Sequence, residues 1–146
     1  MALWVPRRVL ITPGARQWAH GNAIAERAAA LGSDIVEMKT DRLTGLSDED
    51  PRKQYVGAKT SLAIVVASPS KRKLSPIPPS ADWQFHLAEG CPAHCQYCYL
   101  AGSLAGPPVT RVYANVPEIL DGLPAYQGRG AITSKSKTRA GEGTRF

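Results

Sequence analysis

The amino-acid sequence predicts an α/β protein whose N-terminal half forms a small layer of parallel strands and helices. Two β-rich runs flank an alanine-rich helical segment within about 30 residues, the length of a βαβ unit. Hydrophobic residues make up 43% of the 146 residues and charged residues 21%, values typical of a folded soluble chain. No apolar run approaches the ~18 residues of a membrane span, which argues against an integral membrane protein.

The elements of this layer alternate between strand and helix. They are expected as strand 9–12, helix 22–31, strand 34–39, a helix from an N-cap at Ser47 through Lys59, and strand 61–67. Pro13-Gly14 closes the first run, and Gly32 occupies the position just past a helix at which glycine is favoured. These elements place a small α/β domain at residues 1–68.

A proline-rich basic segment, residues 69–80 (PSKRKLSPIPPS), follows this domain and predicts an extended linker. The next domain is expected at 81–127, with strand 83–87, a helix from the cysteine-rich segment through Leu100, strand 110–114 and helix 116–123. Residues 128–146 carry five basic residues against one acidic residue, so most of the net charge of +6 lies in a solvated, flexible tail. The N-terminus shows no secretory signal, which predicts a cytoplasmic location.

All three cysteines of the chain, Cys91, Cys95 and Cys98, fall within eight residues in a C-x3-C-x2-C spacing. An odd, tightly spaced set does not form a disulfide framework, and a cytosolic chain rarely uses one. Thiolates that converge from one short loop suit an iron–sulfur cluster, which needs soft ligands. Three ligands on a four-iron cluster leave one iron open, and an open iron can bind a substrate or cofactor directly.

This cysteine spacing, with an aromatic residue before the third cysteine, resembles the signature of the radical S-adenosylmethionine (SAM) superfamily. The flanking residues 79–123 resemble more narrowly the spore photoproduct lyase family, through S-A-D-x-Q, G-C-x3-C-x-Y-C-Y-L and R-x-Y-x-N-V-x-E-I-L. The resemblance implies that residues 81–127 begin an incomplete (β/α)6 radical SAM barrel, which follows the small α/β layer.

The resemblance also implies the roles of particular residues. Cys91, Cys95 and Cys98 would ligate a [4Fe-4S] cluster, SAM would chelate the open iron, and its reductive cleavage would give a 5′-deoxyadenosyl radical. Tyr97 would lie near the adenine of SAM, and Tyr97 and Tyr99 would relay a hydrogen atom back to it. The implied partners are DNA that contains a thymine dimer lesion and an electron donor such as flavodoxin or ferredoxin. The protein would act as a monomer with no membrane partner.

Members of this family run to more than twice the present length and carry a later hydrogen-donor cysteine. The chain is therefore expected to correspond to the N-terminal portion of such a protein and to be inactive alone. Two alternatives need no radical chemistry. One is a zinc site formed by the three cysteines with His94 or His86. The other is a basic nucleic-acid-binding module that uses the run 71–73 and the tail.

Overall fold

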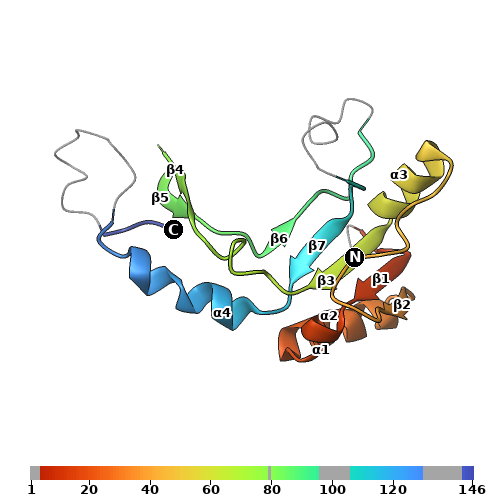
Figure 1. Cartoon of the computed structure of the whole chain (residues 1–146), viewed down its shortest axis with the longest axis horizontal. Coiled ribbons are helices and arrows are strands. Elements are labelled where there is room, and N and C mark those ends of the chain that lie inside the picture. Colours follow the sequence, from red (N-terminus) through yellow and green to blue (C-terminus); the bar gives the residue numbers. More distant parts are fainter. Residues whose placement is uncertain (1–3, 79, 96–105, 130–142) are drawn as a thin grey trace. The chain divides into compact units, whose positions relative to one another are not determined.

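The protein, analysed as a computed structural model, is described over residues 4–78, 80–95, 106–129 and 143–146 (Figure 1). The chain divides into two compact units. We call residues 1–66 and 88–115 the sheet unit, and residues 67–87 and 116–146 the hairpin unit. Each unit is described by itself.

The sheet unit is built on a five-stranded sheet with strand order β2-β1-β3-β7-β6. Its strands are β1 (Arg8–Ile11), β2 (Asp34–Glu37), β3 (Ser61–Val65), β6 (Ala88–Glu89) and β7 (Thr110–Tyr113). Strand β1 pairs in parallel with β2 and β3, and β3 pairs in parallel with β7, so these strands run side by side in Figure 1. The short strand β6 is antiparallel to β7. The predicted parallel α/β architecture is confirmed.

The described residues of this unit form the helices α1 (Pro13–Arg16), α2 (Ala19–Ala30) and α3 (Pro51–Lys59). Helix α2 begins three residues before the predicted start, and Gly32 follows it with a φ of 90°, as predicted for a residue just past a helix. The predicted N-cap of α3 at Ser47 is wrong. Asp50 caps this helix, because its carboxylate accepts a hydrogen bond from the Arg52 backbone N–H at 2.9 Å. Pro51 then occupies the first helical position, where the missing N–H costs nothing.

The core lies on both faces of the sheet, because successive strand residues point to opposite sides. Val9, Ile11 and Ile64 are fully buried in one cluster with alanines of α1 and α2. Leu10 and Ala63 alternate with them and are buried in a second cluster that includes Ala58 of α3. A parallel sheet that is covered on both faces gives continuous apolar runs, which explains why β1 and β3 were recognisable in the sequence.

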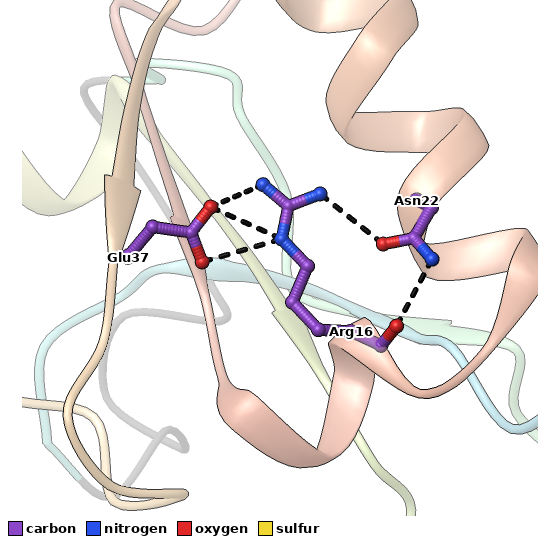
Figure 2. Close-up of polar contacts among 3 residues, drawn as sticks. All are labelled: Arg16, Asn22 and Glu37. Carbon is purple, nitrogen blue, oxygen red and sulfur yellow. Dashed lines mark hydrogen bonds and ion pairs between the residues drawn. The ribbon is translucent and has the colours of Figure 1, made fainter.

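A polar network joins α1, α2 and β2 in this unit (Figure 2). The Arg16 guanidinium pairs with Glu37, and its Nε donates to both carboxylate oxygens at 3.0 and 3.2 Å. Arg16 Nη1 donates to Asn22 Oδ1 at 3.1 Å, and Asn22 Nδ2 donates back to the Arg16 carbonyl at 2.9 Å. The network therefore fixes the turn between the two helices to the end of an edge strand.

The hairpin unit contains the antiparallel strands β4 (Ser75–Ile77) and β5 (Ala81–Gln84), the helix α4 (Val116–Asp121) and a 3-10 helix over Leu123–Tyr126. Strand β4 falls inside the predicted linker 69–80. Both strands of a two-stranded sheet are edge strands, and edge strands tolerate the proline that suggested an extended linker. Trp83 of β5 packs edge-on against Tyr126, with ring centroids 4.9 Å apart.

The predicted domain 81–127 and tail 128–146 are described only in part. Strands β6 and β7 lie in the predicted domain 81–127, yet β7 pairs with β3 of the N-terminal residues and β6 pairs with β7; the predicted domain boundaries remain predictions. Residues 91–95 are not helical, and the rest of the helix predicted through Leu100 lies outside the described residues, as does most of the predicted tail. Within the described part of the chain, no helix has the length and apolar character needed to cross a membrane.

Candidate metal centre

Two of the three predicted cluster ligands lie in the segment that directly follows β6. Cys91 is partly buried and Cys95 is exposed, and both are free thiols. The third ligand, Cys98, lies outside the described residues, as do Tyr97 and Tyr99. In the described ranges, no group of three potential ligand side chains comes together.

The start of the cysteine segment is fixed by Gly90. This residue has a φ of 93°, which strongly favours glycine. A Cβ atom at this position would lie 2.8 Å from the Val109 carbonyl oxygen and 3.1 Å from the Thr110 Cα. Glycine is therefore required twice, for the turn and for the close approach to the start of β7. The buried hydroxyl of Thr110 has no hydrogen-bond partner among the described residues.

Helix α3 holds the cysteine segment from another side. The side chain of Lys59, at the last position of α3, is fully buried, and its Nζ donates a hydrogen bond of 2.7 Å to the Cys91 carbonyl. The same ammonium lies 5.8 Å from the ring centroid of Tyr55. Tyr55 also meets His94 edge-on, with ring centroids 6.0 Å apart. Two positions of the cysteine segment thus contact one turn of α3.

Sequence reasoning missed Lys59 as a neighbour of this segment. The residue is 32 positions away from Cys91. A lysine at the end of a helix is ordinarily interpreted as a solvent-exposed side chain that interacts favourably with the helix dipole. Only the packing of α3 against the sheet brings it to the cysteines. His94, offered as a zinc ligand, packs edge-on against the Tyr55 ring, and the zinc alternative stays a hypothesis.

Strand β6 positions the cysteine segment through Glu89 and Tyr113. Tyr113 is buried on β7, and this burial, together with the charge of Glu89 and a hydrogen bond to it, raises the pKa of the phenol to about 12. Glu89 is the residue immediately before Gly90, so the short β6–β7 pairing fixes the point at which the cysteine segment begins.

The residues present fit an iron–sulfur cluster. Cys91 and Cys95 carry free, at least partly accessible thiols, which are the soft ligands that iron–sulfur clusters require. The first of these thiols starts from a fixed point, because Gly90 lies close to the start of β7 and the Lys59 ammonium donates a hydrogen bond to the Cys91 carbonyl.

Comparison with known proteins decides the family. The family model for spore photoproduct lyase matches residues 4–142. The chain belongs to the spore photoproduct lyase family. It is 33% identical over 144 residues to the spore photoproduct lyase of Bacillus subtilis (strain 168), covering 98% of this chain and 39% of that protein. It is 33% identical over 120 residues to the lyase of Geobacillus sp. (strain Y412MC61), covering 82% of this chain and 35% of that protein.

Solved structures of spore photoproduct lyase agree with the sequence comparison. One, complexed with dinucleoside spore photoproduct, superposes with a TM-score of 0.74 at 31% identity, over 86% of this chain and 36% of that chain. Another, a double mutant with bound AdoMet and dinucleoside spore photoproduct, gives the same TM-score, identity and coverage. The resemblance found in residues 79–123 is thereby confirmed, and it extends through the N-terminal α/β layer. The chain spans between 35% and 39% of the length of these spore photoproduct lyases.

Proposed function

We propose that this chain is the cluster-binding and AdoMet-binding portion of a radical SAM lyase that repairs a thymine lesion in DNA. The observation that carries the proposal is the family match that spans the C-x3-C-x2-C segment, in which Cys91 and Cys95 are free thiols. A lyase structure with bound AdoMet and dinucleoside spore photoproduct supports the cofactor and the lesion.

In this proposal Cys91, Cys95 and Cys98 hold a [4Fe-4S] cluster, and AdoMet binds beside it. The bound cluster and AdoMet supply the radical chemistry, which amino-acid side chains do not provide. The protein supplies position. Gly90 permits the close approach to β7, and Lys59 fixes the Cys91 carbonyl through a hydrogen bond of 2.7 Å.

Tyr97 and Tyr99 are proposed as catalytic residues. Tyr97 would lie near the adenine of AdoMet, and both phenols would relay a hydrogen atom back to it. The support is their place in the family motif C-x-Y-C-Y-L.

The proposed surroundings of the enzyme follow from the same family membership. The chain acts as a monomer in the cytoplasm, takes electrons from a flavodoxin or ferredoxin, and meets DNA that contains the lesion. The exposure of Cys95 supports direct electron delivery, because it leaves one side of the cysteine segment open to a partner protein. Residues 1–146 are proposed not to repair DNA alone, because they match 39% of the length of the Bacillus subtilis lyase.

Anaerobic purification and reconstitution with iron and sulfide test the proposal. The expected result is a brown protein with broad absorbance near 400 nm, stoichiometric iron and sulfide, and AdoMet binding by isothermal titration only after reconstitution. A colourless protein that retains zinc and assembles no cluster would contradict it. Conversion of spore photoproduct to thymines by residues 1–146, measured by chromatography, would show that the chain carries more of the enzyme than we propose.

A further inference from the structure

Lys59 is an unusual residue for its surroundings. Its side chain is fully buried, whereas buried ammonium groups are normally paired with a carboxylate. Its one hydrogen bond within the described ranges goes to a neutral acceptor, the Cys91 carbonyl. No carboxylate of the described residues lies within ion-pair distance of Nζ.

The local fold explains only part of this burial. Lys59 lies in the last turn of α3, where the helix dipole favours a cation. The Tyr55 ring offers a weak cation–π contact, with Nζ 5.8 Å from the ring centroid. An ammonium has three donors, and the described residues accept one of them. A buried charge with spare donors beside a metal-ligand segment indicates an anionic group at that segment.

We infer that Lys59 is the countercharge of the cysteine site, so that it both positions the Cys91 backbone and offsets the negative charge of the ligated cluster. This inference rests on the proposed function, because it needs thiolate ligands. Three thiolates outweigh the charge of about +2 on an oxidised [4Fe-4S] core, so the ligated cluster would carry a net charge of about −1, and reduction by one electron would add one more negative charge. A fixed positive charge nearby stabilises the reduced state more than the oxidised state. Lys59 therefore raises the reduction potential of the cluster.

Three substitutions of Lys59 distinguish the effect of its charge from the effects of its hydrogen bond and of its packing. Lys59→Met keeps the length and apolar stem but removes both the charge and the donors. Lys59→Gln keeps a donor without the charge, and Lys59→Arg keeps the charge. Lys53→Met is the matched control, because Lys53 lies on the same helix with an exposed side chain.

The first measurement needs no cluster. In the cluster-free protein, amide hydrogen exchange across residues 88–95 reports how firmly the segment is held. We expect exchange to rise severalfold in Lys59→Met and to stay near the wild-type rate in Lys59→Arg and in Lys53→Met. Wild-type protection in Lys59→Met would overturn the positioning role.

The second measurement is the reduction potential of the reconstituted cluster, followed by electron paramagnetic resonance. We expect Lys59→Met and Lys59→Gln to make reduction about tenfold less favourable, a shift of about 59 mV to more negative potential for one electron. Lys59→Arg and Lys53→Met should keep the wild-type potential. An unchanged potential in Lys59→Gln would overturn the countercharge role.

The two proposals fail in different ways. If the wild-type chain assembles no cluster, the proposed function fails, and the exchange experiment still tests whether Lys59 holds the segment. If the wild-type chain assembles the cluster but the Lys59 variants match its potential, only the present inference fails. Where Lys59→Met does not fold by circular dichroism, the pair Lys59→Arg and Lys59→Gln makes the same comparison.

Discussion

The sheet unit and the hairpin unit differ most in how much apolar surface each buries. Among the described residues, all the buried hydrophobic side chains except Ala67, Leu74 and Ile119 belong to the sheet unit. The described residues of the hairpin unit make individual side-chain contacts instead, such as the Trp83–Tyr126 ring contact and the Arg72–Glu118 ion pair. The cysteine segment starts from the better-packed unit, because Gly90 lies against Val109, a member of a buried core cluster.

The largest effect is expected from substitution of a cysteine, which should remove the cluster without changing the packing of the sheet unit. Cys91→Ala, Cys95→Ala and Cys98→Ala should each abolish cluster assembly, because a cluster held by three thiolates from one loop has no spare ligand. The far-UV circular dichroism of the cluster-free chain should not change. Iron and sulfide analysis with absorbance near 400 nm measures the result. Stoichiometric iron in any of the three variants would contradict the assignment.

Core truncation should distinguish the two units directly. Ile64 in β3 and Ile119 in α4 are both essentially fully buried. Ile64→Ala should cost about 3–5 kcal/mol of unfolding free energy, because its neighbours on a two-sided sheet cannot collapse into the cavity. Ile119→Ala should cost about 2 kcal/mol, because a small unit can rearrange around it. Urea denaturation measures both, and equal costs would show that the hairpin unit is packed as tightly as the sheet unit.

The same difference in packing decides how much of the fold was predictable. Strands β1 and β3 were identified because continuous burial leaves apolar runs in the sequence, and Gly32 marked a helix end through its conformational preference. The N-cap of α3 was misplaced because Ser47 and Asp50 both offer a suitable oxygen, and only the hydrogen bond to Arg52 decides between them. Strand β4 was not predicted, because prolines conceal a short edge strand.

The sequence predicted the metal-ligating residues of the candidate site, but it did not predict the residues that hold those ligands in place. Three cysteines at a fixed spacing indicate their own ligand role, since spacing within one loop is local information. The contact between Lys59 and Cys91 spans 32 residues, and the pairing of β7 with β3 is of still longer range. Neither leaves a local pattern, because each depends on how complete elements pack.

Alkaline pH should weaken the sheet unit through Tyr113. Its pKa is raised to about 12 in the fold, while an unfolded chain ionises near 10. The fold favours the neutral phenol, so this contribution to the free energy of unfolding is fully present below pH 10. It is lost as the pH rises toward 12, and the free energy of unfolding falls by roughly 2 kcal/mol. Tyr113→Phe should remove this part of the pH dependence. Urea titrations at pH 9 and pH 11 measure it, and an unchanged slope in the phenylalanine variant would contradict the assignment.

The smallest expected effect compares the two surface ion pairs, Arg16–Glu37 in the sheet unit and Arg72–Glu118 in the hairpin unit. Glu37→Gln and Glu118→Gln should each cost less than about 1 kcal/mol, because both pairs are partly exposed to solvent. The hydrogen bond from Arg16 lowers the pKa of Glu37 in the folded state. The ion pair therefore stabilises the fold above the pKa that Glu37 has in the unfolded chain, and this stabilisation is lost as the pH falls through the pKa that Glu37 has in the folded state.

Wild type and Glu37→Gln should therefore differ in stability at neutral pH and converge in acid. Arg16 also bonds Asn22, which keeps its guanidinium in place without the carboxylate partner. Removing Glu37 should consequently leave the joint between α1 and α2 intact. Hydrogen exchange of the α2 amides tests this point. Faster exchange across the first turn of α2 in Glu37→Gln would mean that the carboxylate, and not Asn22, holds the joint.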